Sequence, residues 1–262
     1  MKFFSRLARG LGREAAPRGT DGARAYAVGD IHGRLDLLEA LLAKIEGDMA
    51  EREPRRTFIV FLGDLIDRGA ESAGVVERLR TYRPRGARPI FLAGNHEEVM
   101  LEILGGRSDI LADWMKFGGA ECVASYGVDV DRLRRLDERA ATELLRQAVP
   151  RAHVEFLESF GDTFRFGDYL FVHAGIRPGL TLETQDRRDL RWIREPFLSD
   201  AKEHGFVVVH GHTIGEGVEE RANRIGIDTG AYRTNVLTAV AVEDDQRWYL
   251  STGPDDAVEA RL

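Results

Sequence analysis

The sequence predicts an α/β fold in which two mixed β-sheets pack as a sandwich and helices flank them. Short apolar runs alternate with helical patterns over roughly the first hundred residues, which is typical of a largely parallel sheet. The middle is instead rich in Leu, Ala, Arg and Glu, and the last part returns to short β-branched runs. With 262 residues and 43% hydrophobic content, the chain can bury a sizeable core in one large domain or two small ones.

The first part of this pattern gives three strands and three helices in alternation. Apolar, β-branched and aromatic runs predict strands over residues 25–28, 57–62 and 89–92. Helical spacing of apolar residues predicts helices over residues 35–46, 72–80 and 97–104. This order implies parallel strands whose carboxyl ends meet at one edge of a sheet.

The middle of the chain, about residues 105–161, is predicted to form several helices, the clearest over residues 131–148. It carries no cluster of ligand-type residues, so we expect a helical insertion that covers the active-site face; a plain scaffold is the alternative. The later part predicts strands over residues 169–172, 206–210, 224–227, 236–242 and 247–250. Short spacing in the last of these favours a second sheet that is mainly antiparallel or mixed.

The two ends of the chain are expected to lie outside the folded domain, which we place at residues 24–252. Residues 1–23 carry five basic against two acidic side chains and are predicted to form a flexible arm. An interfacial helix is the alternative for residues 1–12, and it would bring them to a membrane surface. Residues 253–262 are predicted to form a loose tail. No stretch has the 18 or more consecutive apolar residues of a membrane span.

Charge and cysteine content narrow the partners and the compartment. A net charge of −7 gives no basic signature for nucleic acid, so we expect neither a nucleic-acid partner nor a stable membrane partner. The single cysteine, Cys122, excludes an internal disulfide and suits a reducing compartment, which predicts a cytoplasmic protein. We expect Cys122 to be a buried small apolar residue and not a catalytic thiol.

Residues of ligand type stand at the ends of the predicted strands. Asp30 and His32 follow the first strand, Asp64 follows the second and Asn95 follows the third. Because parallel strands bring their carboxyl ends to one edge, these four side chains are expected to converge. Each residue alone could be a helix cap, a turn residue or a hydrogen-bonded bystander, but the ordered set indicates a metal site.

Two histidines, His173 and His212, end later strands and would reach this site from the second sheet. A mixed set of nitrogen and oxygen ligands suits Mn²⁺, Fe or Zn²⁺, with Mn²⁺ the expected ion. The imidazoles argue against Ca²⁺, which takes oxygen ligands. Asp64 follows the central strand and is the natural bridge between two ions. The expected ligands are Asp30, His32 and Asp64 for the first ion, and Asp64, Asn95, His173 and His212 for the second.

Seven short segments carry a resemblance to a known family. They read GDIHG (29–33), GDLIDRG (63–69), GNHE (94–97), VHAG (172–175), LRWIRE (190–195), HGHT (210–213) and IDTGA (227–231). In this order they resemble the phosphoprotein phosphatase (PPP) family of metallophosphoesterases, and most of all its bacterial and phage branch, which includes the phage lambda protein phosphatase. The resemblance covers roughly residues 24–242 apart from the helical middle. It implies the metallophosphoesterase fold and a serine/threonine protein phosphatase activity.

The residues around the metals predict a mechanism. A hydroxide bridging two cations would attack phosphorus in line, without a phosphoenzyme. His96 is expected to give the leaving alkoxide its proton, with Asp67 orienting the imidazole, and the resemblance implies the same roles. Arg68 would neutralise charge on the phosphate oxygens. The resemblance makes Arg194 the second phosphate-binding arginine, and the neighbouring alternatives are Arg187, Arg188 and Arg191.

The substrate is expected to be phosphoserine or phosphothreonine in a protein or peptide. Class III phosphodiesterases carry a GHxH motif, and Ile214 in place of its second histidine favours the PPP arrangement. The closer alternative is a symmetrical diadenosine tetraphosphatase or another nucleotide-polyphosphate hydrolase, a branch that often lacks a carboxylate at the position of Asp67 and reads GNHD. The presence of Asp67 and Glu97 supports a phosphoprotein substrate. We expect Glu97 to stabilise a helix N-terminus and not to bind metal. A catalytically silent metal-binding module would have lost part of the His96–Asp67 pair, which is present.

Overall fold

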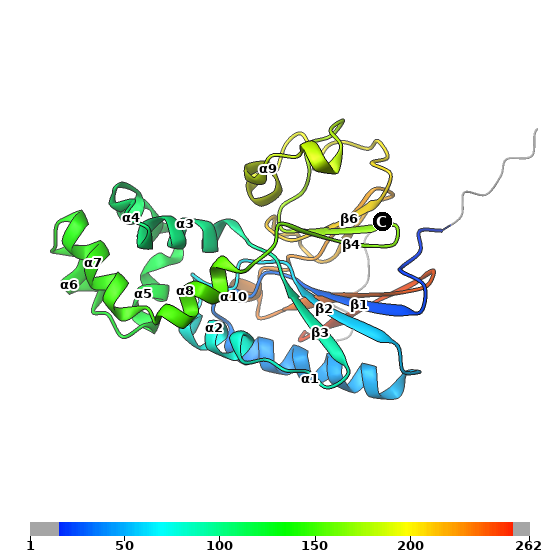
Figure 1. Cartoon of the computed structure of the whole chain (residues 1–262), viewed down its shortest axis with the longest axis horizontal. Coiled ribbons are helices and arrows are strands. Elements are labelled where there is room, and N and C mark those ends of the chain that lie inside the picture. The colour runs from blue at the N-terminus through cyan, green and yellow to red at the C-terminus, as the bar shows by residue number, and fades with distance from the viewer. Residues whose placement is uncertain (1–15, 254–262) are drawn as a thin grey trace, which may run out of the picture.

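The computed structural model describes residues 16–253, and the strands in this part of the chain form two five-stranded mixed sheets (Figure 1). The first sheet has, in spatial order, β10 (Gln246–Ser251), β9 (Thr238–Glu243), β1 (Ala23–Val28), β2 (Arg56–Phe61) and β3 (Ala87–Phe91). The second has β4 (Thr163–Phe166), β5 (Tyr169–Val172), β6 (Val207–His210), β8 (Arg224–Gly226) and β7 (Glu219–Glu220). The predicted class, an α/β sandwich of two mixed sheets, is confirmed.

Strand direction explains where polar residues can gather. β1, β2 and β3 run parallel to one another, as do β5, β6 and β8. The remaining strands, β4, β7, β9 and β10, pair antiparallel with their neighbours. The carboxyl ends of three strands from each sheet therefore open toward common loops.

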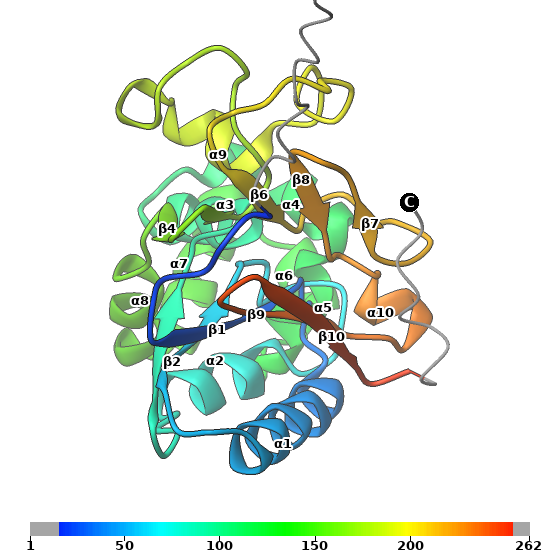
Figure 2. The same cartoon turned by 90° about the vertical axis from the view of Figure 1, so that its right-hand side faces the viewer.

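The two sheets share a hydrophobic core. Alternate residues of β1 point in opposite directions, as the two-residue period of a strand requires. Ala25 and Ala27 pack with residues of the second sheet such as Phe171, whereas Tyr26 and Val28 face the helices. Helices α1 (Leu35–Glu51) and α2 (Ser72–Arg80) cover that outer face of the first sheet, as Figure 2 shows. The outer face of the second sheet is covered by loops and α9 (Arg187–Trp192).

Most other helices lie between β3 and β4 in the sequence. In space they gather at one end of the molecule (Figure 1). They are α3 (Asn95–Leu104), α4 (Leu111–Trp114), α5 (Ala120–Ser125), α6 (Val130–Arg134), α7 (Glu138–Ala148) and α8 (Arg151–Glu158). A 3₁₀ turn (Ser108–Ile110) and a kinked turn (Met115–Gly119) connect some of them. The helix predicted over 131–148 is two helices, because the side chain of Asp137 caps a new N-terminus by accepting from the amide of Ala140. A four-residue helix, α10 (Ala231–Thr234), follows later.

Three further features of the fold differ from what the sequence predicted. The strands predicted over 236–242 and 247–250 belong to the first sheet, because β9 pairs antiparallel with residues 24–28 of β1 and β10 pairs with β9. The strands β4 and β7 were not predicted; β4 is short, and β7 consists of two glutamates. Part of the predicted arm packs on the domain, since the amides of Arg18 and Gly19 donate to Asp168 Oδ2 (2.8 Å) and to the carbonyl of Asp244 (2.7 Å).

The remaining arm residues, 1–15, and the tail from 254 onward lie outside the described residues. Cys122 is buried, as expected. Within residues 16–253, no helix is both long and apolar enough to cross a bilayer.

Candidate active site

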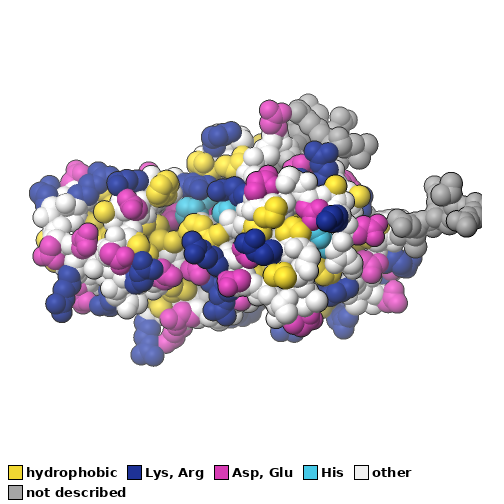
Figure 3. All heavy atoms as spheres, turned by 90° about the horizontal axis from the view of Figure 1, so that it is seen from above, with side chains coloured by type: hydrophobic (Ala, Val, Ile, Leu, Met, Phe, Trp, Pro, Cys, Tyr) yellow, Lys and Arg dark blue, Asp and Glu magenta, His cyan; other side chains and the backbone are white. Residues whose placement is uncertain are grey.

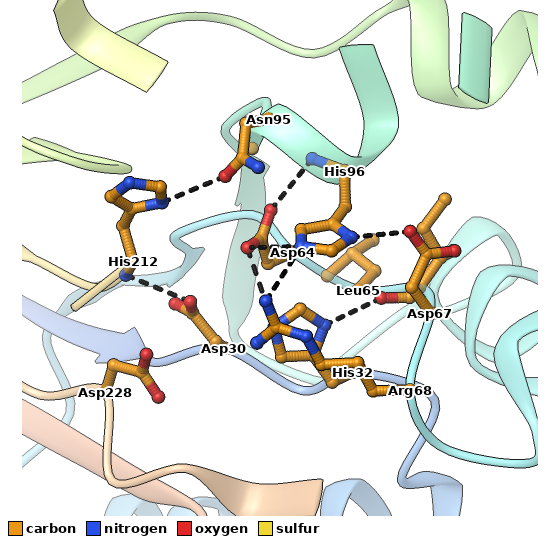
Figure 4. A network of polar contacts seen from close by, with 12 residues as sticks. Asp30, His32, Asp64, Leu65, Asp67, Arg68, Asn95, His96, His212 and Asp228 are labelled. Atoms are coloured by element: carbon orange, nitrogen blue, oxygen red, sulfur yellow. Dashed lines mark hydrogen bonds and ion pairs between the residues drawn. The ribbon is translucent and has the colours of Figure 1, made fainter. Parts of the chain in front are cut away.

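The loops at the carboxyl ends of the strands bring the six predicted metal ligands together, and all of them except His173 are labelled in Figure 4. Asp30 and His32 follow β1, Asp64 follows β2, and Asn95 begins α3 directly after β3. The second sheet supplies the other two from the ends of β5 and β6. All six side chains are buried, at 0–8% exposure: Asp30, His32, Asp64, Asn95, His173 and His212.

Asp64 lies at the centre of the cluster. Its Oδ1 is 3.4 Å from His173 Nε2, and its Oδ2 is 3.6 Å from His32 Nε2 and 3.8 Å from His96 Nε2. Potential ligand atoms form two groups, His32–Asp64–His96 and Asp64–His173–His212. Within each group, these atoms all lie within 4.8 Å of one another. Asp64 belongs to both groups, which is the position that a bridging carboxylate requires. The first group contains His96 where the sequence predicted Asp30.

Hydrogen bonds outside the cluster orient its imidazoles. His32 Nδ1 lies 2.8 Å from the carbonyl of Ile66, and His173 Nδ1 lies 3.0 Å from that of Leu62. A ring whose Nδ1 donates to a carbonyl presents an unprotonated Nε2, which is the form that binds a cation. Burial lowers the pKa of His32 to about 3, which favours the same neutral form.

The second group is completed by an amide. Asn95 Oδ1 lies 3.1 Å from His173 Nε2 and 2.9 Å from His212 Nδ1. Burial lowers the pKa of His212 to about 3, and its Nε2 is buried with no hydrogen-bond partner among the described residues. These neutral nitrogens and carboxylate oxygens form the mixed donor set that borderline divalent cations prefer.

Two buried carboxylates, Asp30 and Asp228, indicate that this site suits a positively charged ligand. Asp30 Oδ2 accepts from the amide of His212 (2.9 Å), but Asp30 Oδ1 and Asp228 Oδ2 have no hydrogen-bond partner within the described chain. Burial, together with Asp228 and Asp64, raises the pKa of Asp30 well above its usual range, and burial raises that of Asp228 to about 6. Buried unpaired carboxylate oxygens are costly, so the residues fit a divalent cation at this place. Asp228 lies in the segment IDTGA, and no role was predicted for it.

His96 and Asp67 form the pair that the sequence predicted. His96 Nδ1 lies 2.5 Å from Asp67 Oδ2. Burial alone would lower the pKa of His96, but the carboxylates of Asp64 and Asp67 raise it above its usual value, which favours the protonated ring. The other nitrogen, Nε2, faces the cluster, 3.2 Å from an Nη of Arg68.

Two arginines stand beside this pair. The Arg68 guanidinium is 2.9 Å from His32 Nε2 and lies over the ring of Tyr232, 4.9 Å from its centroid. Arg194 lines the same cavity as Arg68 and His212. The neighbouring alternatives Arg187 and Arg191 instead form ion pairs with Asp162, at 3.1 and 2.6 Å.

The cavity has a volume of about 490 Å³ and opens between the second sheet and the helical insertion. Its lining includes Asn95, His96 and His212 of the site together with the two arginines, and also five apolar and aromatic residues: Val99, Ile110, Trp114, Phe117 and Trp192. Figure 3 shows histidine side chains reaching the surface between basic and hydrophobic side chains. The insertion therefore lies beside the active-site face, as one of the two interpretations expected.

Glu97 has a larger part in the site than its expected place in a helix first turn. Its Oε2 accepts from the amides of Gly94 and Asp64, both at 2.9 Å, and its Oε1 accepts from the amide of Leu65 at 2.8 Å. Burial and the nearby Asp64 raise its pKa to about 7, while the amide donors favour the charged form. Glu97 thus ties the loop after β2, which carries Asp64, to the start of α3.

His153 is a further buried histidine, and it lies outside the cluster of predicted ligands. Its Nε2 lies 3.0 Å from a carboxylate oxygen of Glu77, and its Nδ1 lies 3.1 Å from the hydroxyl of Tyr126. It joins α8 to α2 and takes no part in the metal cluster.

Comparison with known proteins identifies the family. The sequence profile of the calcineurin-like phosphoesterases matches residues 23–235. The chain belongs to this family. The phosphoesterase is similar to proteins that carry two different names. It is 31% identical over 185 residues to a symmetrical bis(5'-nucleosyl)-tetraphosphatase of Klebsiella pneumoniae, covering 67% of this chain but only 54% of that protein.

A second relative is covered more completely. The phosphoesterase is 27% identical over 229 residues to serine/threonine-protein phosphatase 1 of Salmonella typhimurium, covering 83% of this chain and 91% of that one. Among solved structures, one provisionally named a diadenosine tetraphosphatase superposes with a TM-score of 0.62 at 21% identity, covering 92% of this chain and 100% of that chain. At this identity the likeness shows the metallophosphoesterase fold, and the names leave the substrate open.

Removing divalent cations should lower the thermal stability of the phosphoesterase, because Asp30, Asp64 and Asp228 would then share a buried site without a balancing charge. A cation at about 100 times its Kd stabilises the folded state by about 2.7 kcal/mol, which is roughly 5–10 °C in Tm for a domain of this size. Calorimetry of protein dialysed against a chelator, with and without added Mn²⁺, would measure this shift. An unchanged Tm at saturating Mn²⁺ would contradict a cation site in this cluster.

Proposed function

We propose that the phosphoesterase is a phosphomonoesterase that removes phosphate from phosphoserine and phosphothreonine in proteins, using two divalent cations. Mn²⁺ is the proposed ion, and Fe and Zn²⁺ are the alternatives. The observation that carries the proposal is the His96–Asp67 contact at the edge of the metal cluster. A serine alkoxide is a poor leaving group and needs a proton, which this pair is placed to supply. The similarity to serine/threonine-protein phosphatase 1 of Salmonella typhimurium supports the proposal.

The residues divide the work in a simple way. The cations, held by the six predicted ligands, would supply Lewis acidity and lower the pKa of bound water. Arg68 and Arg194 both line the cavity, and their planar guanidinium groups suit the oxygens of a phosphate. His96 donates its proton to the leaving oxygen, and Asp67 keeps the ring oriented and cationic.

A second substrate class is favoured by a separate observation. Two large aromatic side chains beside the cavity are exposed, Phe117 at 67% and Trp192 at 41%. Nucleobases stack on such faces, so a dinucleoside polyphosphate could bind here, in keeping with the name of the Klebsiella pneumoniae relative. Because a nucleotide phosphate leaves more easily than an alkoxide, this reaction depends less on the His96–Asp67 pair.

A direct comparison of substrates tests the proposal. Metal-stripped protein refilled with Mn²⁺ should hydrolyse a phosphoserine or phosphothreonine peptide with higher kcat/KM than diadenosine tetraphosphate. Preference for the dinucleotide would overturn the substrate assignment. A pair of variants then examines base stacking: Trp192→Ala should raise KM for a stacked dinucleotide about tenfold, and Trp192→Phe, which keeps an aromatic face, should not.

We also propose a cytoplasmic location, which rests on the single buried cysteine and the reducing compartment that it suits. Fractionation of cells that express a tagged full-length chain would test this, and recovery outside the cytoplasm would contradict it.

A further inference from the structure

We propose that the helical insertion takes part in catalysis through Trp114, a positioning residue for the Asp67–His96 pair. The inference rests on the proposed function, because it takes His96 as the proton donor. The insertion would then be a component of the active site and not merely a wall beside it.

The contact that carries the inference is a hydrogen bond from the indole. Trp114 Nε1 donates to Asp67 Oδ2 at 2.7 Å, and the same oxygen is 2.5 Å from His96 Nδ1. Asp67 is fully buried, and its Oδ1 has no hydrogen-bond partner among residues 16–253. Two donors that meet on one oxygen fix the plane of the carboxylate and, through it, the direction of the imidazole. Trp114 is itself only 3% exposed, so water does not compete for this carboxylate.

The backbone after Trp114 is shaped to hold the indole in place. The residues that follow it form a kinked turn between two helices, in which Phe117 and Gly118 leave helical geometry. Within this turn, Gly119 lies against the indole so closely that a Cβ there would come within 2.4 Å of a ring atom. A side chain at residue 119 would therefore displace the ring from Asp67.

The same turn also forms a hydrogen bond with Arg68, the residue after Asp67. The amide of Arg68 donates to the carbonyl of Gly118 at 3.0 Å. Asp67 and Arg68 have φ values of 72° and 67°, a left-handed conformation that costs energy for residues with side chains. Gly118 itself has a φ of 109°, and a Cβ on it would lie 2.6 Å from the Arg68 amide nitrogen. The insertion thus contacts both residues of this strained turn. Trp114 bonds to the side chain of Asp67, and Gly118 bonds to the backbone of Arg68.

Packing alone does not explain the choice of tryptophan. A buried residue that only filled space would need no N–H group, and a phenylalanine would avoid placing a donor in the interior. Here the donor is matched to a buried carboxylate that is also bonded to the proposed acid. The indole therefore orients Asp67 in the same way that Asp67 orients His96.

Trp114→Phe is the direct test, because it keeps an aromatic ring and removes the donor. In the full-length, Mn²⁺-refilled enzyme, kcat for a phosphoserine peptide should fall about tenfold, as expected for one lost hydrogen bond to a charged group. KM and bound metal should stay unchanged. With p-nitrophenyl phosphate, whose leaving group needs little protonation, the loss should be smaller.

The matched control is Trp248→Phe. Trp248 Nε1 also donates to a carboxylate, Asp48 Oδ2 at 3.2 Å, but it does so on β10, outside the active-site cavity. This variant should leave kcat for both substrates unchanged. If Trp114→Phe fails to fold, Gly119→Ala provides a second route, since it should push the indole off Asp67 and give the same dependence on the leaving group.

A combined variant separates positioning from a general loss of structure. In the His96→Asn background, Trp114→Phe should cause no further decrease in kcat, because residues that act through one group are not additive. An additive loss, or an equal loss with both substrates, would overturn the inference. So would normal turnover in Trp114→Phe while His96→Asn remains slow, and the proposed function would then stand. Normal turnover in both variants would reject the proposed acid itself.

Discussion

Replacing Asp64 with Asn should remove bound divalent cation and phosphoesterase activity together. Asp64 is the one residue shared by the two groups of potential ligand atoms in the described chain. Its two carboxylate oxygens lie 3.4 Å from His173 Nε2 and 3.6 Å from His32 Nε2, so it can reach a cation held by either group. An amide in its place would lose the charge that two cations need between them. Elemental analysis after gel filtration, together with hydrolysis of p-nitrophenyl phosphate, would measure both effects.

The matched control for this experiment is Asp131→Asn. Asp131 is an exposed residue of α6 that forms an ion pair with Arg134, 3.6 Å away, and its substitution should change neither metal content nor turnover. The bridging role of Asp64 would be wrong if Asp64→Asn kept two equivalents of metal. Loss of turnover with full metal content would instead move Asp64 from metal binding to a direct role in the reaction.

The sequence could predict that these ligand-type side chains gather at one place, because their geometry follows from strand direction. Asp30, Asp64 and Asn95 follow three parallel strands, and no knowledge of tertiary contacts is needed to expect them at one edge. The histidines from the second sheet were harder to place, since nothing local says that two sheets face each other. Their recognition depended on the motifs that contain them.

Other parts of the site depend on contacts that no local pattern encodes. Glu97 occupies a helix first turn, as predicted, but its bonds to the amides of Asp64 and Leu65 span 33 and 32 residues. The bond from Trp114 to Asp67 spans 47 residues and begins in a segment without ligand-type residues. The same limit explains the misplaced strands: β9 is apolar enough for either sheet, and only its pairing with β1 decides between them.

Replacing His96 with Asn should leave the cations in place and slow turnover of a phosphoserine peptide by roughly two to four orders of magnitude, the range for a lost general acid. The reason is geometric: His96 Nδ1 is engaged by Asp67, and only Nε2 faces the cluster. The loss should be much smaller for an aryl phosphate, because its leaving group is stable without a proton. Steady-state kinetics on both substrates and metal analysis of the same preparation would test this.

Asp67→Asn provides the companion measurement. If the carboxylate orients His96 and keeps it cationic, this variant should show the same dependence on the leaving group with a smaller loss in kcat. His96 also belongs to one of the two groups of potential ligand atoms, so it could bind a cation instead of donating a proton. Loss of about one equivalent of metal in His96→Asn, with equal slowing of both substrates, would establish that alternative. Retained metal with selective slowing of the peptide would leave proton donation as the role of His96, because a metal ligand would affect both leaving groups alike.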